Sequence, residues 1–340
     1  MTGKRWRAGG YGAVLVIGLA LAFGFPAFAS LHATIQLTNA LALALFALSL
    51  ALVWGFGGIL CFGQAAFFGL GAYAYAVGAI NFGDTTFAWP LAILIPAAFA
   101  AGLGYFMFYG RLSDVYLGVV TLTVTLILFK LFNSTAGPEY RIGSARLGGF
   151  NGMPSAPPLN APFNPGAFLS PEAIFVVAAL ALLAAYFGCV WLLRTRFGRV
   201  LVSIRENPLR AELLGYDVRA HKLVAFIIGG GMAGVAGMLF AQNVLVSPML
   251  FSLLYTAQVI IWVIVGGLGT LIGPILGSIS LQYIMAWLGT LGWINPNLAL
   301  GIILVTFVLL VPRGLWPLLT SLTASHRQHA RSGETKKNAS

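Results

Sequence analysis

The chain has 340 residues, of which 59% are hydrophobic and 8% are charged, and its mean hydropathy is +0.91. Soluble domains carry roughly 25% charged residues, so 19 basic and 8 acidic side chains cannot cover a soluble surface of this size. The composition excludes a soluble enzyme and predicts an all-α, polytopic membrane protein. A β-barrel would show alternating segments of about 10 residues, whereas the apolar runs here are unbroken.

About ten apolar stretches are long enough to cross a hydrocarbon core, which needs on the order of 20 residues per helix. They are 11–29, 35–54, 63–81, 89–109, 115–132, 172–193, 223–243, 253–271, 274–291 and 297–312. The first stretch lies between a basic start and the segment Ala27-Phe28-Ala29, a pattern that also fits a cleavable signal peptide. We expect it to remain as a span, with cleavage as the alternative.

Basic residues collect on one side of these ten spans. The largest group lies in the loop 194–222, and others precede the first span, follow the fourth and end the chain. By the positive-inside rule, both termini and this loop are predicted to be cytoplasmic, and the loop 133–171 periplasmic. The net charge of +11 is therefore explained by membrane topology and implies no nucleic-acid partner.

The predicted organisation is one transmembrane domain over 1–320 and a disordered, basic cytoplasmic tail over 321–340. The loop 194–222 is expected to serve as a cytoplasmic coupling segment. The Gly- and Pro-rich loop 133–171 is expected to form ordered turns or a short surface helix rather than a domain.

Two glycine-rich clusters, one in each half of the chain, separate neighbouring apolar stretches. The first occupies 54–73 and the second 265–277. Helices broken at corresponding positions expose backbone groups that can hold a polar solute, and they are tolerated only where protein or a watery cavity covers them. Close helix packing by small residues is the alternative interpretation. The residues predicted to line a solute pathway are Gly63, Gln64, Tyr73, Thr121, Gln258, Gly266, Gly267 and Gly269.

No residue in the spans supplies a driving force for transport. The carboxylates lie at span ends or in loops, and the phosphate-binding pattern G-x-x-x-x-G-K-[ST] does not occur. Cys61 and Cys189 are expected to be packing residues, and His326 and His329 fit a solvated tail better than a metal site. We therefore expect no enzyme activity, metal or cofactor, and either passive conduction or energy from a partner.

The arginine-rich loop between the sixth and seventh stretches offers a docking surface for such a partner. Pro208 is suited to begin a helix and Gly215 to end it, while Leu209, Leu213 and Leu214 form one apolar stripe. Such a helix suits a groove on a soluble protein. The alternative is a helix that lies flat on the bilayer with its arginines on lipid phosphates.

Several segments together resemble the M-type permease subunit of branched-chain amino acid ABC transporters. They are the first glycine cluster, the segment 111–122, the inner loop and Gly266-Gly267-Leu268-Gly269-Thr270. The resemblance covers roughly 35–315 in consistent order. Cys61-Phe62-Gly63-Gln64 departs from the Ser-Leu-Gly-His-like tetrad of relatives, which leaves the solute open.

The resemblance implies an inner-membrane permease that works by alternating access. It implies four protein partners, in addition to the surrounding membrane lipid. These are a second, homologous permease, two cytoplasmic ABC ATPases and a periplasmic substrate-binding protein. Branched-chain or related amino acids are the implied solutes, with urea or short amides, or passive conduction of a small neutral solute, as alternatives. The residues implied in coupling to the ATPase are Arg205, Glu206, Asn207, Ala211, Leu214 and Gly215.

Overall fold

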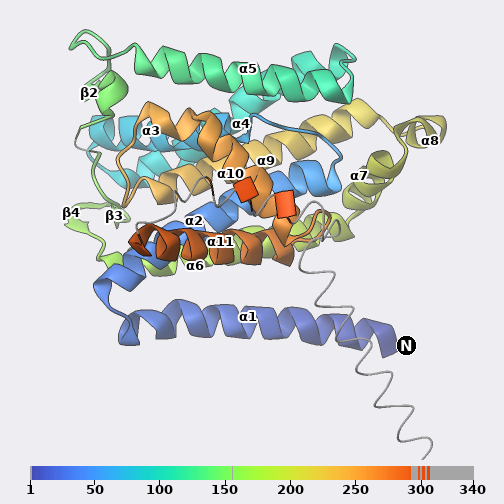
Figure 1. The fold of residues 1–340 in the computed structure, drawn as a ribbon, viewed down its shortest axis with the longest axis horizontal. Coiled ribbons are helices and arrows are strands. Elements are labelled where there is room, and N and C mark those ends of the chain that lie inside the picture. Colours follow the sequence, from blue (N-terminus) through green and yellow to red (C-terminus); the bar gives the residue numbers. More distant parts are fainter. Residues whose placement is uncertain (1, 155, 292–297, 299–300, 303–304, 307–340) are drawn as a thin grey trace, which may run out of the picture.

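The computed structural model describes residues 2–154, 156–291, 298, 301–302 and 305–306, with side chains for these residues except 2–11, 13 and 291. These residues form a bundle of helices with short strands gathered at one end (Figure 1). The tenth predicted stretch, 297–312, lies largely outside the described residues. The predicted tail, 321–340, lies wholly outside them.

The helices follow the apolar stretches of the sequence in chain order. They are α1 (Thr2–Phe28), α2 (Leu31–Leu50), the π-helical η1 (Ala51–Phe56), α3 (Gln64–Phe82), α4 (Thr85–Tyr109), α5 (Asp114–Asn133), α6 (Pro171–Arg194), α7 (Arg196–Glu206), α8 (Pro208–Leu213), α9 (Val218–Phe240), the 3-10 turn η3 (Pro248–Phe251), α10 (Leu253–Gly266) and α11 (Ile272–Leu291). Short polar side chains begin several of them. Ser30 accepts the Ala33 amide at 3.3 Å at the start of α2, and Ser170 does the same for Ala173 in α6.

Seven segments of the described chain are long and apolar enough to span a membrane. Two shorter apolar segments, Val14–Phe28 and Leu253–Gly266, accompany them. The polytopic all-α class is therefore confirmed, whereas the count of ten spans is not. The predicted stretch 253–271 is shorter than expected, because α10 has 14 residues and a helix of that length rises about 21 Å.

Small residues allow the central helices α3, α4 and α9 to pack closely. A Cβ atom on Gly71 would lie 2.3 Å from Gly234 Cα, and one on Gly237 would lie 1.9 Å from the Phe68 carbonyl oxygen. Helices in lipid gain most of their association from such close contact, because lipid tails are as apolar as the side chains. In Figure 1, α5 covers one side of this core, whereas α1 lies on the other and contacts chiefly α6.

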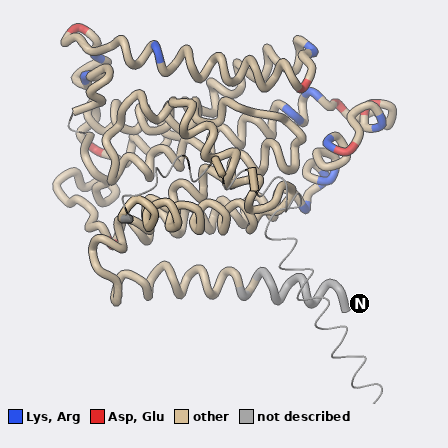
Figure 2. The backbone as a smooth tube through the Cα atoms, in the orientation of Figure 1, with Lys and Arg blue, Asp and Glu red and all other residues tan. Residues whose placement is uncertain are grey.

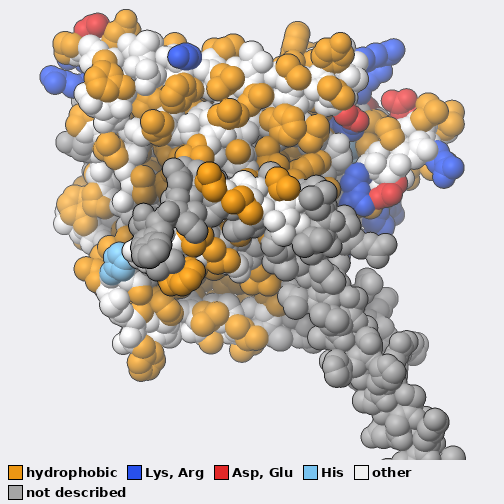
Figure 3. Space-filling model, viewed as in Figure 1, with side chains coloured by type: hydrophobic (Ala, Val, Ile, Leu, Met, Phe, Trp, Pro, Cys, Tyr) orange, Lys and Arg blue, Asp and Glu red, His pale blue; other side chains and the backbone are white. Residues whose placement is uncertain are grey.

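The two ends of the bundle differ in charge and in structure. Lys and Arg gather around α7 and α8, where α1 also begins (Figure 2). We call this end the basic end. The opposite end, which carries the strands, is the hairpin end. Between the two ends, the coloured side chains in Figure 3 are chiefly hydrophobic, as a membrane-embedded belt requires.

The predicted loop 133–171 is ordered, and it forms strands rather than a surface helix. β1 (Arg141–Ile142) pairs with β2 (Ala145–Arg146), and β3 (Asn160–Ala161) pairs with β4 (Asn164–Phe168), both antiparallel; the 3-10 turn η2 (Gly149–Asn151) lies between the two hairpins. Side chains of the bundle fasten this loop. The Tyr75 hydroxyl donates to the Pro157 carbonyl at 2.9 Å, and Gln242 Oε1 accepts the Leu159 amide at 2.9 Å.

Candidate functional site

The two glycine clusters form turns that meet at the basic end. In the first, the chain leaves η1, turns through Gly58 at φ +67° and starts α3 at Gln64. In the second, α10 ends at Gly266, and the turn contains Gly267 and Gly269 at φ +119° and +83°. Each cluster thus joins two helices into a hairpin, α2–α3 and α10–α11.

The turns touch each other directly. A Cβ atom on Gly55 would lie 3.1 Å from the Gly269 backbone nitrogen and 3.6 Å from its Cα. Any larger residue at position 55 would push the turns apart. The two clusters, which lie at corresponding positions in the sequence, are thus in contact, and the second turn lies against the end of η1.

Arg205 of α7 inserts between the two turns. Its guanidinium donates through Nη1 to the Gly55 carbonyl oxygen, and the same Nη1 lies 3.2 Å from the position of a Cβ on Gly269. A Cβ on Gly58 would lie 2.9 Å from Arg205 Cγ. The side chain is 32% exposed and also pairs with Glu206. Positive φ and lack of space therefore both favour glycine at position 58, for reasons that involve Arg205.

Gln64 stands at the start of α3 and links three helices. Its Nε2 donates to Ser49 Oγ of α2 at 2.8 Å and to the Gly229 carbonyl of α9 at 3.1 Å. The side chain is buried, and its Oε1 has no hydrogen-bond partner among the described residues. Sequence reasoning selected Gln64 but not Ser49 or Gly229, because nothing in the spacing along the chain relates the three.

Thr121 of α5 holds the first turn from the other side. Its hydroxyl accepts the Phe62 amide at 3.1 Å and bonds the Leu117 carbonyl at 2.9 Å. A Cβ on Gly63 would lie 2.4 Å from the Thr121 carbonyl oxygen. Gly63, Gln64 and Thr121 are thus brought together around the same turn.

The remaining predicted pathway residues lie apart from this group. Tyr73 is buried in α3 and packs its ring on Phe132 and Phe251, with centroids 4.3 and 5.6 Å away. Gln258 is half-buried on α10. Gly266 meets the start of α11, where its Cβ would lie 2.2 Å from the Gly273 carbonyl oxygen. These contacts of Tyr73 and Gly266 are packing contacts in the present arrangement.

The helix predicted to begin at Pro208 is present as α8, and a second short helix, α7, precedes it in the predicted coupling segment. Asn207 ends α7 and caps α8, accepting the Arg210 amide at 3.0 Å. Ala211 is fully buried, whereas Leu214 is 73% exposed. Gly215 has φ +84° with nothing within 4 Å of its Cβ position, so a bulky residue there would strain the backbone without a clash.

Apolar side chains protrude from this segment at the tip of the basic end. Leu209 is 65% and Leu213 80% exposed, beside Leu214. Figure 3 shows hydrophobic side chains among the Lys and Arg of this tip. The leucine stripe predicted from the sequence is therefore turned away from the bundle.

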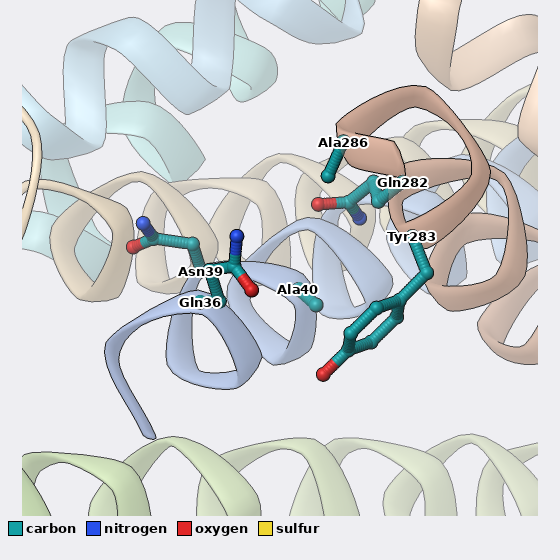
Figure 4. Close-up of a pocket in the computed structure, with 6 residues that line it drawn as sticks. All are labelled: Gln36, Asn39, Ala40, Gln282, Tyr283 and Ala286. Atoms are coloured by element: carbon teal, nitrogen blue, oxygen red, sulfur yellow. The ribbon is translucent and has the colours of Figure 1, made fainter. Parts of the chain in front are cut away.

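A second polar site, which sequence reasoning did not select, lies between α2 and α11. Its hollow measures about 150 Å³. Figure 4 shows the Asn39 and Gln282 amides turned toward each other across it. Two amides three residues apart on α2, Gln36 and Asn39, were a signal available in the sequence. The lining residues are Gln36, Asn39, Ala40, Gln282, Tyr283 and Ala286.

Comparison with known proteins agrees with this architecture. A family described as the branched-chain amino acid transport system permease component matches residues 33–311. The high-affinity branched-chain amino acid permease protein LivM of Escherichia coli K12 is 30% identical over 328 residues, covering 89% of this chain and 74% of that protein. LivM of Salmonella typhimurium is 29% identical, covering 88% and 73%. No solved structure matches.

A more distant relative covers less of the chain. The probable permease protein LivH of Methanocaldococcus jannaschii is 28% identical over 157 residues, or 42% of this chain and 48% of that protein. The family match confirms the resemblance seen in the sequence, and it makes the chain a transport subunit rather than an enzyme. With seven candidate spans among its described residues, this multi-pass membrane protein belongs to the family of branched-chain amino acid transport permease components.

Proposed function

We propose that the chain is the permease subunit of an ATP-driven importer that carries branched-chain or related amino acids across the inner membrane. The contact of Arg205 with both glycine turns carries this proposal. Because Arg205 belongs to the segment that ends in the protruding leucines, a push on that segment would reach two helical hairpins at once. The names of the LivM relatives support the solute class.

The energy would come from partners at the basic end. We place this end in the cytoplasm, following the positive-inside rule, and the hairpin end in the periplasm. One of the two ATPase subunits would receive Leu209, Leu213 and Leu214 of this chain in a groove, as other proteins receive amphipathic helices. A second, homologous permease and a periplasmic binding protein at the hairpin end would complete the importer.

The solute pathway would open where the first turn is now closed. Gln64 and Thr121 are bonded to neighbouring helices, and Gln64 Oε1 is a buried acceptor without a described partner. A buried acceptor in that condition costs on the order of 1–3 kcal/mol, so a second state in which a polar solute meets it is favoured locally. Gly63 and Gly269 would then act as the points at which the hairpins tilt, with Tyr73, Gln258, Gly266 and Gly267 farther along the path.

Transport by the assembled complex tests this proposal. The chain would be purified with its partner subunits, reconstituted in liposomes and supplied with binding protein, ATP and radiolabelled leucine. We expect concentrative, ATP-dependent uptake of leucine in preference to urea or acetamide. Nucleotide-independent uptake by this chain alone would establish a passive channel instead, and preference for urea or acetamide would establish a short-amide importer.

A further inference from the structure

The polar hollow between α2 and α11 lies in the half of the bundle nearer the hairpin end. Asn39 belongs to the first part of α2 and is bonded by Asn243, which follows α9 at that end. Gln282 and Tyr283 belong to the second half of α11, which runs back toward the hairpin end in Figure 1. The site is therefore separate from the two glycine turns at the basic end.

The Asn39 and Gln282 side-chain amides each use one polar atom in a hydrogen bond to a neighbouring residue. Asn39 is left with a free donor and Gln282 with a free acceptor. Asn39 Oδ1 accepts from Asn243 Nδ2 at 3.2 Å, so the Asn39 amino group remains available. Gln282 Nε2 donates to Ser278 Oγ at 2.9 Å, so Gln282 Oε1 remains available. Neither of the two remaining groups has a partner among the residues that the structure describes. In Figure 4 they face one another across the hollow, beside the Tyr283 ring.

Asn39 and Gln282 are half-buried, and Gln36 and Tyr283 beside them are exposed, so the hollow opens to the surface of the described residues. The free donor of Asn39 and the free acceptor of Gln282 are therefore accessible to a ligand. The described lining also holds no charged side chain, so a free ion would lose its hydration without meeting a counter-charge. The lining therefore suits a polar occupant of zero net charge.

We propose that this hollow binds a small zwitterionic amino acid, with its carboxylate on the Asn39 amino group and its ammonium on Gln282 Oε1. Gln36 and Tyr283 complete the polar part of the lining, but their amide and hydroxyl groups point away from the Asn39–Gln282 pair in Figure 4. The volume suits a solute smaller than a drug-sized ligand, which needs about 300–1,000 Å³. The identity of the solute rests on the proposed function, whereas the existence of the site does not.

Substitutions that remove one hydrogen-bonding group at a time test the site. In the reconstituted complex, Asn39→Leu and Gln282→Leu are expected to raise the KM for leucine uptake at least tenfold. Tyr283→Phe keeps the ring of a partly exposed residue, so folding is preserved, and it should raise KM about threefold. Ser280→Leu, an exposed position on α11 outside the lining, is the matched control and should leave KM unchanged.

Equilibrium binding separates failure of the site from failure of the proposed function. Radiolabelled leucine and acetamide would be offered to the complex without nucleotide or binding protein. Loss of leucine binding in Asn39→Leu and Gln282→Leu, with Ser280→Leu intact, supports the site even if wild type performs no ATP-dependent uptake. Acetamide bound in place of leucine overturns the zwitterion assignment. The proposal is overturned if leucine binding and KM are unchanged in all three lining variants. It is also overturned if these variants lose co-purification of a second permease while KM stays the same, because the hollow would then belong to a subunit interface.

Discussion

The guanidinium of Arg205 donates a hydrogen bond to the carbonyl oxygen of Gly55, 150 positions earlier in the chain. The same side chain lies against Gly58 and Gly269, so one residue of α7 holds the turns of two helical hairpins. The contact joins α7, which leads into the exposed α8, to the two glycine turns. It is the basis of the first two predictions.

Arg205→Ala is expected to uncouple ATP hydrolysis from transport. Without the guanidinium, movement of α7 and α8 reaches the turns only through backbone, so leucine uptake should fall at least tenfold while ATPase activity is retained. Arg205→Lys keeps the charge but not the planar fork, and it should recover part of the uptake. Arg196→Ala, on the exposed first turn of α7, serves as control. Equal uptake by Arg205→Ala and Arg196→Ala would contradict the role of the contact.

Two glycines with nearly the same positive φ distinguish the effect of backbone strain from that of a crowded Cβ position. Gly58 and Gly83 have φ +67° and +66°, but a Cβ meets Arg205 only at position 58 and nothing within 4 Å at position 83. Replacement by alanine should cost about 1–2 kcal/mol of stability at each, because the left-handed region disfavours Cβ. Thermal unfolding would measure this cost. Only Gly58→Ala should also reduce uptake, and a similar loss in Gly83→Ala would refute the distinction.

The bond between Gln64 and Ser49 is expected to stabilise the junction of α2 and α3. Gln64→Leu leaves the Ser49 hydroxyl without its buried partner, and the loss should be about 1–3 kcal/mol. A double-mutant cycle with Ser49→Ala, read by thermal unfolding, should give a coupling energy of about 0.5 kcal/mol or more. Additive effects of the two substitutions would show that the bond contributes nothing.

Asp84 makes the hairpin end sensitive to acid. The Asn160 side-chain amide, followed by the Thr86 backbone N–H, lowers the pKa of Asp84 below its ordinary value of 3.8. Because the pKa is lower in the folded state, the carboxylate stabilises the fold above pH 3.8, and this contribution is lost as the pH falls below that value. The Tm of wild type should therefore fall relative to that of Asp84→Asn between pH 5 and the lowest pH at which the protein stays folded. If the Tm of wild type and that of Asp84→Asn change in parallel with pH, ionisation of Asp84 does not contribute to stability.

The protruding leucines of α8 are expected to bind a soluble partner. Leu213→Gln should abolish co-purification of the ATPase subunits. The chain should stay folded, because the Leu213 side chain is 80% exposed and makes little contact with the bundle. Leu245→Gln, an exposed leucine at the hairpin end, is the matched control. If Leu213→Gln leaves the complex intact but reduces binding of α8 peptides to anionic vesicles, the segment is a lipid-surface helix instead.

Local patterns predicted the helices and the position of both glycine clusters, because apolar stretches and turn residues act over a few positions. The same patterns did not show that the clusters touch, since contact between Gly55 and Gly269 depends on how α2 and α10 pack. Arg205 was selected as a coupling residue from resemblance, but its insertion between the turns is a tertiary contact. The Asn39–Gln282 pair was missed for the same reason, because its two halves lie at opposite ends of the sequence.

The position of α1 at the edge of the bundle determines what cleavage of this first helix would change. Among the described residues, the Phe25 ring of α1 packs on Phe175, and Gly18 of α1 lies against Leu183. Phe175 and Leu183 both belong to α6. The buried ring pairs Phe67–Phe226 and Phe46–Phe68 join α2, α3 and α9 instead. Loss of the first helix would uncover the face of α6 that carries Phe175 and Leu183, while the ring pairs among α2, α3 and α9 would keep their contacts. Trimming of this segment is therefore expected to change the flank of the bundle and not its centre.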